Sequence, residues 1–380
     1  MILFNQCSIT DLEEKYMLDA LHHKQCGDGS YTKKVYQLYE EKLGIKNMLL
    51  TTSCSTALDM TAILADIKEG DEVILPSYTF VSTANAFVLR GAKPVFCEID
   101  PRTMNIDADK IEALITDRTK AIYPVHYAGV ICDMDKIIAL AKRYHLTVIE
   151  DAAQAVGSVY QGKYPAGTIG DMGCFSYHET KNYTMGEGGA LIVKDPELLK
   201  KAEIIREKGT DRSKFIRGEI DKYSWQTAGS SYLPSDILAA LLLAQTERFD
   251  EIMEKRMHVW NAYHEAFADL EADGKLIRPY IPSYSTHNAH LYYFFVKNAA
   301  TRNEMLDYLK QNGIGAVFHY IPLHTSPMGE RLGYHKGDLP LTEEYAARLI
   351  RLPLHANLTD GEIEYIIDKV KAVLDHDQTV

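Results

Sequence analysis

The sequence predicts an α/β protein with a mostly parallel sheet, followed by a smaller α/β unit. Short apolar runs alternate with helical patterns through the first half of the chain, which is typical of parallel strands joined by helices. A length of 380 residues is sufficient for two domains with a large core. We therefore expect a large domain over residues 1–240 and a small C-terminal domain over residues 241–380, with the boundary inside a long helix.

The first elements lead to a turn that is rich in hydroxyl groups. The expected elements before it are helices over about 8–23 and 31–44 and a strand at 48–50. The turn, Thr51-Thr-Ser-Cys-Ser-Thr56, runs directly into a helix that begins near Ala57. Helix N-termini carry unpaired N–H groups and a partial positive charge, so the hydroxyl-rich turn favours an anion site. Ordinary capping of the helix by Ser55 or Thr56 is the alternative.

Polar and aromatic side chains follow several strands of the predicted sheet. The expected elements here are strands at 72–75, 93–96, 120–125 and 146–149, and helices through about 89 and over 108–115 and 134–144. Phe80 and His126 come just after two of these strands, and Asp151 follows another. Ligands of such sheets bind beyond the carboxyl ends of the strands, so we expect these groups on the binding edge.

One lysine lies between two short strands and a glycine turn. Polarity alternates over Phe175–His178, which predicts one strand, and residues 190–193 predict another. The run Gly186-Glu-Gly-Gly189 allows a tight turn before the second strand, because glycine tolerates positive φ. Burial disfavours the charged form of lysine, so Lys181 in this place indicates a Schiff base with a carbonyl cofactor. An exposed loop lysine is the alternative.

The rest of the chain begins with a mixed-charge stretch and ends in a second α/β pattern. Residues 206–222 contain six lysines and arginines, and a solvated loop is the simplest interpretation of such a run. Ser235 is in a position to cap a long helix that continues to about Phe267. The remaining expected elements are a strand at 290–296, a helix at 302–311, a strand at 316–319 and a closing helix from 362 to about 374.

Composition and charge exclude several classes of protein. The net charge of −12 argues against a general surface for nucleic acid or anionic membranes. The six cysteines form no C-x-x-C pair, so neither a metal site nor a redox dithiol is predicted, and scattered cysteines fit a reducing cytoplasm. No apolar run approaches the ~18 residues of a membrane span, and the N-terminus lacks the pattern of a secretory signal. We expect a cytoplasmic protein.

Four features together predict a site for pyridoxal 5′-phosphate (PLP). The turn at 53–57 offers a helix N-terminus to the phosphate, and the ring of Phe80 offers a flat surface for stacking. Asp151 is an acid partner for the pyridine nitrogen, which makes the ring an electron sink. Lys181 supplies the amine that condenses with the aldehyde. Each feature meets a different requirement of the same cofactor.

Six motifs resemble those of the DegT/DnrJ/EryC1/StrS family of sugar aminotransferases, and the resemblance covers nearly the whole chain. The motifs are Ser53-Cys-Ser-Thr-Ala-Leu58, Pro76-Ser-Tyr-Thr-Phe80, Pro124-Val-His-Tyr-Ala-Gly129, Ile149-Glu-Asp-Ala-Ala-Gln154, Phe175-Ser-Tyr-His-Glu-Thr-Lys181 and Gly186-Glu-Gly-Gly189. The resemblance implies PLP as the cofactor, the aspartate aminotransferase fold (type I of the PLP enzymes) and a homodimer with shared active sites. Residues 80–91, 206–210 and 318–324 carry a closer likeness to family members that aminate dTDP-4-oxo-6-deoxyglucose at C4 for the enterobacterial common antigen.

The resemblance also implies roles for single residues in the cofactor site. Lys181 is implied as the catalytic Schiff-base lysine, and Asp151 as the partner of the pyridine nitrogen. Gln154 is implied as the contact to the ring hydroxyl, and Phe80 as the stacking aromatic. The implied phosphate contacts are Ser55, Thr56 and Ser176.

One segment departs from the family pattern. Family members usually carry a G-x-N-x-R segment whose asparagine reaches the phosphate site of the neighbouring subunit, whereas this chain has Gly229-Ser-Ser-Tyr-Leu233. Ser231 is a shorter donor, and Leu233 removes the usual positive charge. The expected substrate contacts are Arg212, Lys214 and Arg217 for the sugar diphosphate, which can act across the dimer, and His319, Tyr320 and His324 for the sugar. A structural role is the alternative for each of the last three.

The predicted reaction transfers the amino group of L-glutamate to the C4 keto group of dTDP-4-oxo-6-deoxy-D-glucose. The products are 2-oxoglutarate and a dTDP-4-amino-4,6-dideoxyhexose, with the galacto form favoured, for surface polysaccharide synthesis. Lys181 moves the proton in this scheme, as base and then as acid. The alternatives are a C3-specific aminotransferase, a PLP sugar dehydratase, against which Lys181 argues, and a non-catalytic sensor or regulator. No GxGxxG follows the first strand, which argues against a dehydrogenase of the nucleotide-binding fold.

Overall fold

A seven-stranded sheet forms the centre of the larger part of the molecule. The computed structural model describes residues 1–23 and 25–376. The strands of the sheet are β1 (Met48–Thr51), β2 (Glu72–Pro76), β3 (Lys93–Cys97), β4 (Thr119–Ile122), β5 (Thr147–Asp151), β8 (Met172–Ser176) and β9 (Gly189–Val193). Their order is β1-β9-β8-β5-β4-β2-β3, and β9 alone runs antiparallel to its neighbours. The predicted mostly parallel α/β sheet is confirmed.

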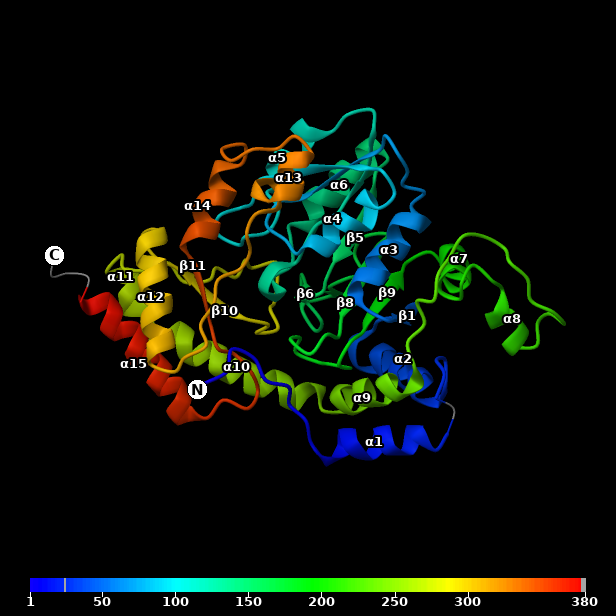
Figure 1. Cartoon of the computed structure of the whole chain (residues 1–380), viewed down its shortest axis with the longest axis horizontal. Coiled ribbons are helices and arrows are strands. Elements are labelled where there is room, and N and C mark those ends of the chain that lie inside the picture. Colours follow the sequence, from blue (N-terminus) through cyan, green and yellow to red (C-terminus); the bar gives the residue numbers. More distant parts are fainter. Residues whose placement is uncertain (24, 377–380) are drawn as a thin grey trace.

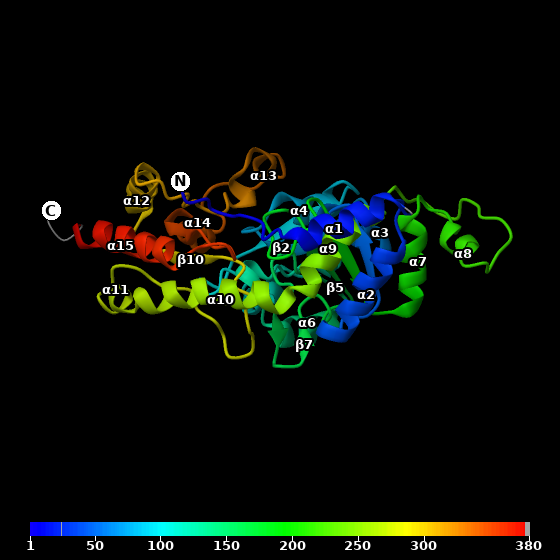
Figure 2. The ribbon, with the colours of Figure 1, turned by 90° about the horizontal axis from the view of Figure 1, so that it is seen from below.

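Helices cover both faces of this sheet (Figures 1 and 2). One face carries α2 (Ser30–Leu43), α5 (Ala108–Ile111), α6 (Met134–Tyr144) and α9 (Asp236–Glu247). The other carries α3 (Cys54–Leu64), α4 (Val81–Val88) and α7 (Pro196–Arg206). Successive strand residues point to opposite faces, so Ile74 belongs to the first core, whereas Val73 and Leu75 belong to the second. Helix α1 (Asp11–Leu21) packs against α9 outside this arrangement.

The C-terminal part has its own core around a two-stranded sheet. Strands β10 (Tyr292–Phe295) and β11 (Leu349–Leu352) pair antiparallel. The helices of this part are α10 (Phe249–Ala266), α11 (Ala268–Ala272), α12 (Ala299–Gln311), α13 (Pro327–Arg331), α14 (Pro340–Arg348) and α15 (Asp360–His376). Apolar side chains from α10, β10, α12, β11 and α15 form one buried cluster. The remaining elements of the chain are β6 (Val159–Tyr160), β7 (Tyr164–Pro165), α8 (Arg212–Ile216), and the 3-10 turns η1 (Glu112–Leu114), η2 (Tyr127–Gly129) and η3 (Leu323–Thr325).

Two predicted elements differ most from the structure. The long helix predicted from Ser235 is two helices, α9 and α10, with Arg248 between them at φ −94° and ψ 16°. The guanidinium of Arg248 donates to the carbonyl of Ser8 and to Glu13, and these contacts with a distant segment accompany the break. The strand predicted at 316–319 is an extended segment with one bridge, Val317 to Arg351. The domain boundary at residue 240 stays a prediction.

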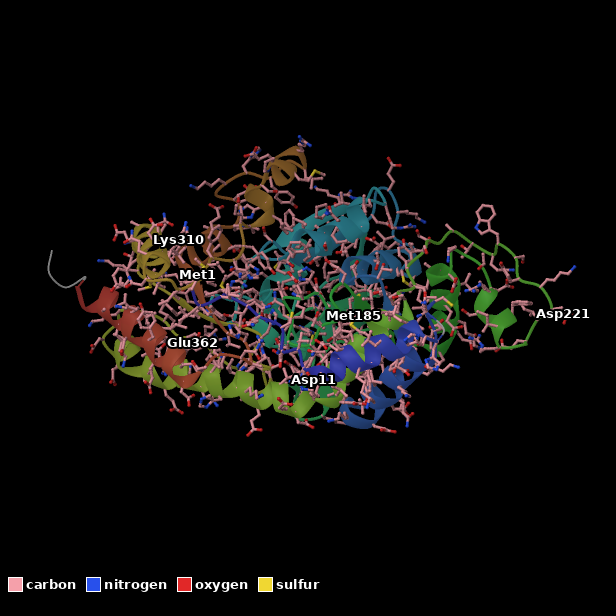
Figure 3. The ribbon with its side chains drawn as sticks, turned by 60° about the horizontal axis from the view of Figure 1, so that its bottom comes forward. Met1, Asp11, Met185, Asp221, Lys310 and Glu362 are labelled. Carbon is pink, nitrogen blue, oxygen red and sulfur yellow. The ribbon has the colours of Figure 1, made fainter. Side chains whose placement is uncertain are left out.

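The first residues of the chain connect the C-terminal part to the loop before Lys181. Ile2 forms a bridge with Ile314, and Figure 3 shows Met1 near Lys310 in the same region. Asn5 donates its side-chain N–H to the carbonyl of Glu179 at 3.1 Å. Residues 2–7 therefore run as a strap along the molecule. No helix in the described ranges is both long and apolar enough to cross a membrane.

Candidate active site

A cavity of about 640 Å³ lies between the sheet and the C-terminal part. The ends of β5 and β8 and the N-terminus of α3 contribute to its wall from the sheet side. Residues 317–320 and β11 contribute from the other side. Eight of the predicted site residues line it: Ser55, Phe80, Asp151, Gln154, Ser176, Lys181, His319 and Tyr320. The cavity thus lies at the carboxyl ends of parallel strands, where such sheets bind their ligands.

Lys181 extends into this cavity from the turn that follows β8. Its backbone N–H donates to the carbonyl of His178 at 2.9 Å, which fixes the turn. Burial of the amine lowers the pKa of Lys181; the nearby Cys54 and Asp151 raise this pKa and Arg351 lowers it further. A lowered pKa leaves more of the amine in its neutral, nucleophilic form at a given pH. Lys181 lines the cavity and is only partly exposed, so the alternative of an exposed loop lysine is wrong.

Asp151 is held at the end of β5 by a chain of two threonines. Thr83 donates its hydroxyl to Oδ2 of Asp151 at 2.7 Å, and the N–H of Ala153 donates to Oδ1 at 3.2 Å. The hydroxyls of Thr79 and Thr83 are 2.8 Å apart. Because the single hydroxyl proton of Thr83 goes to Asp151, Thr79 donates to Thr83. The carboxylate is only 5% exposed and has a fixed orientation.

The N-terminus of α3 opens onto the cavity. Ser53 is the N-cap, and it forms a reciprocal capping box with Thr56. No acceptor in the described chain receives the N–H groups of Cys54 and Ser55. The hydroxyl of Ser55 lies 2.6 Å from the hydroxyl of Ser82. These two hydroxyls are further possible donors, in addition to the two N–H groups. The arrangement offers donors to an anion.

Glycine at one position of β9 permits this opening. A Cβ at Gly189 would lie 2.4 Å from the nitrogen of Cys54 and 2.5 Å from the carbonyl carbon of Ser53. Any side chain here would therefore displace the first turn of α3. This close approach explains why glycine stands at the first position of β9.

Three rings and one amide group complete the wall. Gln154 accepts from the N–H of Ala128 at 2.7 Å and donates to the hydroxyl of Tyr320 at 3.0 Å. The ring of Phe80 is 56% exposed and tilts 45° to the ring of Tyr320, with centroids 6.4 Å apart. Burial lowers the pKa of His319, whose ring stacks on Tyr320, so this histidine is neutral near neutral pH.

Three predicted residues lie outside the cavity wall. The hydroxyl of Thr56 is used in the capping box of α3. His324 is completely buried, with Nδ1 2.7 Å from the hydroxyl of Ser77 and Nε2 3.0 Å from Glu343. His126, expected on the binding edge, is completely buried and pairs with Glu150 at 2.8 Å. The structural alternative therefore describes His324 in this chain.

The remaining predicted residues lie on an arm formed by residues 212–231. Figure 1 shows α8 and the loop after it standing off from the rest of the chain, and Figure 3 shows Asp221 at the outer end. Arg212 pairs with Glu207, and Arg217 pairs with Glu203. None of the four predicted residues on this arm lines the cavity of its own chain; they are Arg212, Lys214, Arg217 and Ser231.

Sequence reasoning missed three groups around the cavity. Phe4 comes from the N-terminal strap, Thr83 from α4, and Arg351 from β11. The signal for Thr83 was its position four residues after Thr79, which places both hydroxyls on one side of a helical turn. A lone arginine within the apolar run of β11 was the signal for Arg351.

The chain was compared with known proteins and solved structures. The model of the DegT/DnrJ/EryC1/StrS aminotransferase family matches residues 8–371. The chain belongs to this family. It is accordingly a PLP-dependent aminotransferase, and the predicted cofactor and the predicted type I fold are confirmed. The finer likeness to enzymes of the common antigen pathway stays a prediction.

Three similar proteins illustrate the extent of the similarity. The spore coat polysaccharide biosynthesis protein SpsC of Bacillus subtilis is 37% identical over 87% of this chain and 86% of its own. GDP-perosamine synthase of Caulobacter vibrioides is 35% identical over 95% of both chains. The PLP form of the sugar aminotransferase Spr1654 of Streptococcus pneumoniae superposes with a TM-score of 0.90, at 28% identity over 99% of both chains.

Proposed function

We propose that this aminotransferase moves the amino group of L-glutamate to the C4 keto group of dTDP-4-oxo-6-deoxy-D-glucose in the cytoplasm. The product is a dTDP-4-amino-4,6-dideoxyhexose, with the galacto form favoured, for a surface polysaccharide. The observation that carries the proposal is the meeting of two segments at the cavity. Phe80 begins one segment of closer likeness, and Phe318 to Tyr320 begin another; all line the same cavity. The polysaccharide context agrees with the name of the relative SpsC.

The side chains of the cavity fit PLP, and we assign their roles as follows. The free N–H groups of α3, with Ser55 and Ser176, would hold the phosphate. Asp151 would pair with the pyridine nitrogen, and Gln154 would contact the ring hydroxyl. When bound, the cofactor supplies an electron sink for the carbon that loses or gains a proton.

Lys181 carries the proton transfer. Its amine would remove the proton from the α-carbon of glutamate as a base. In the second half of the reaction, the protonated amine would give a proton to C4 of the sugar as an acid. Burial lowers the pKa of this amine, which favours the base form that the first step needs. Asp151, fixed by Thr83, keeps its charge in one position through both halves.

The arm supports the proposal of a homodimer with shared active sites. Every residue from 221 to 231 is exposed, including Trp225 at 80%. Phe215, Ile216 and Tyr223 are exposed as well, and isolated chains rarely expose apolar groups so close together. We propose that the arm packs on a second copy and brings its cations to the sugar diphosphate there.

An absorbance experiment tests the reaction. L-Glutamate should bleach the visible band of the PLP-loaded protein, and dTDP-4-oxo-6-deoxyglucose should restore it. NMR couplings at C4 of the product then give the stereochemistry, and a product aminated at C3 would favour the C3-specific alternative. The GDP-linked keto sugar is the matched comparison, because the relative GDP-perosamine synthase carries GDP in its name. Bleaching without recovery by either sugar would refute the sugar assignment.

Mixed dimers test the arm. A Lys181→Ala subunit is combined with a subunit that carries alanine at Arg212, Lys214 and Arg217. If the arm acts on the partner's site, each mixed dimer contains one intact site, and random assembly restores about one quarter of wild-type activity. If the arm acts on its own subunit, both sites of the mixed dimer stay defective. Unmixed samples of each variant are the controls.

A further inference from the structure

The imidazole of His290 has one fixed tautomer in the wall of the cavity. His290 is 8% exposed and lines the cavity together with Lys181. The side-chain N–H of Asn182 donates to the carbonyl of Asn288 at 2.7 Å, so the Oδ1 atom of Asn182 is an acceptor. Nδ1 of His290 lies 2.9 Å from this Oδ1 and therefore carries the ring proton. In the neutral ring, Nε2 then has a free lone pair.

The ring of His290 is neutral near neutral pH, and its Nε2 is an unused acceptor. Burial lowers the pKa of His290 well below its usual value, and the charges of Lys181, Arg256 and Arg351 act in the same direction. The only side-chain hydrogen bond of this ring within the described residues uses Nδ1. Nε2 is not among the nitrogens that are enclosed without a partner, so it is open to the cavity.

The backbone around His290 holds the ring in place. The guanidinium of Arg256, which is 2% exposed, donates to the carbonyls of Ala289 and His290 at 3.1 and 2.6 Å. The N–H of His290 donates to Oδ1 of Asn288 at 3.1 Å. With the bond to Asn182, the ring is therefore fixed through both its backbone and its Nδ1 atom.

The amine of Lys181 has space beside this ring. It forms no ion pair or side-chain hydrogen bond within the described residues. A second cavity, of about 10 Å³, is lined by Lys181, Asn182 and His290 among others. Val156 and Tyr183 also line it but do not line the main cavity, so this space extends away from the site of the cofactor. Its volume is close to the minimum for one water molecule.

We propose that Nε2 of His290 accepts a hydrogen bond from the amine of Lys181 whenever this amine is free, and holds its protonated form after it has removed the proton from the donor. This inference rests on the proposed function, in which Lys181 carries the proton. An enclosed ammonium group is unfavourable without an acceptor. A neutral nitrogen supplies one and adds no negative charge that would keep the amine in a permanent ion pair.

The other acceptors near the amine have other proposed partners. Asp151 would pair with the pyridine nitrogen of the cofactor, and Ser176 would contact its phosphate. Gln154 already donates to the hydroxyl of Tyr320 and would contact the ring hydroxyl of the cofactor. The lone pair of His290 has no such assignment, which leaves it available to Lys181.

Two variants separate the two nitrogens of the ring. His290→Asn places an amide near the position of Nδ1 and keeps the bond to Asn182, but it removes Nε2. His290→Gln reaches the position of Nε2 with an acceptor, but it lacks Nδ1. Competitive labelling of the cofactor-free protein with acetic anhydride, followed by mass spectrometry, gives the pKa of Lys181 in each protein. We expect His290→Asn to lower this pKa by about one to two units and His290→Gln to leave it within about half a unit.

The other titratable and charged groups around Lys181 stay the same in all three proteins. They are Cys54, Asp151, His178, Glu187, His319 and Arg351. A larger decrease in His290→Gln than in His290→Asn would show that the ring acts only through Asn182, and it would overturn the proposal. An unchanged pKa in both variants would overturn it as well.

The donor half-reaction gives an independent readout. In His290→Asn, the rate of bleaching at saturating glutamate should fall by about 10- to 100-fold, and its rise with pH should level off at a lower pH than in the wild type. KM for glutamate should stay within about twofold. A raised KM with an unchanged maximal rate would place His290 in substrate binding instead. If no keto sugar restores the band but both pKa values follow the expected order, the sugar assignment fails and this inference stands.

A thermal measurement controls for misfolding. His290→Gln should melt at a lower temperature than His290→Asn, because only the glutamine variant loses the bond to Asn182. The expected order of stability is thus opposite to the expected order of the pKa shifts. If His290→Asn were instead the less stable variant, loss of structure would explain its lowered pKa, and the proposal would be overturned.

Discussion

The hydrogen bond from Thr83 to Asp151 allows a quantitative test of how the cofactor site is supported. Thr83→Val keeps nearly the same shape but removes the hydroxyl. The Asp151 carboxylate, 5% exposed, then keeps only the N–H of Ala153 at 3.2 Å. A hydrogen bond to a charged group contributes about 1.5–3 kcal/mol, so the free energy of unfolding should fall by about that amount.

The corresponding change in melting temperature follows from the size of the chain. An entropy of unfolding of about 2.1 cal/mol/K per residue gives about 0.8 kcal/mol/K for 380 residues. The cofactor-free Thr83→Val protein should therefore melt about 2–4 °C below the wild type. Scanning calorimetry of the two proteins without PLP measures this difference directly.

Thr79→Val is the matched control, because it removes only the second, uncharged link of the chain. Its loss of about 0.5–1.5 kcal/mol predicts a decrease of about 0.6–2 °C. The reasoning would be refuted by a Thr83→Val protein that melts with the wild type, or by an equal decrease for both variants. In either case the hydrogen bond from Thr83 would not stabilise the Asp151 carboxylate.

Three further perturbations have definite expected outcomes. Lys181→Ala should form 2-oxoglutarate about 10²- to 10⁴-fold more slowly than the wild type. In the wild type, the lowered pKa of Lys181 means that the rate of the donor half-reaction rises with pH and levels off below pH 10.5. A rate that is still rising at pH 10.5 would contradict the burial argument. Gly189→Ala should weaken PLP binding, measured by fluorescence titration, because its Cβ would lie 2.4 Å from the nitrogen of Cys54, and unchanged affinity would show that α3 adjusts freely. Ser77→Ala should lower the free energy of unfolding by about 1–3 kcal/mol, because it leaves the buried Nδ1 of His324 without its partner, while KM for either substrate stays constant; a changed KM would return His324 to the substrate site.

The parts of the site that follow strand ends were predictable from the sequence. Asp151 and Lys181 stand next to β5 and β8, whose apolar runs are plain, and the direction of parallel strands then places both groups on one edge. The N-terminus of α3 could be predicted for the same reason, but the sequence did not identify Ser53 as its N-cap. Local patterns decide these features, so a single sequence is sufficient.

Features that depend on distant segments were not predictable. No glycine or proline marks the break at Arg248, which bonds to Ser8 and Glu13 in the N-terminal region. The buried chain from Ser77 through His324 joins residues 247 positions apart, so the sequence alone leaves both a substrate contact and a structural role open for this histidine. Nothing in the local pattern distinguishes these cases from exposed side chains.

The pairing of β1 with β9 has a consequence for synthesis of the protein. Thr51 at the end of β1 pairs with Gly189 at the start of β9, and the chain between them takes about 7–28 s to make at ~5–20 residues per second. Helix α3 leaves the ribosome within the first part of that interval, but the strand that supports its first turn arrives last. The apolar strand β1 remains without its pairing strand for the same period. Nascent chains that stop before residue 189 should therefore depend on chaperones, and full-length chains should lose that dependence once β9 has emerged.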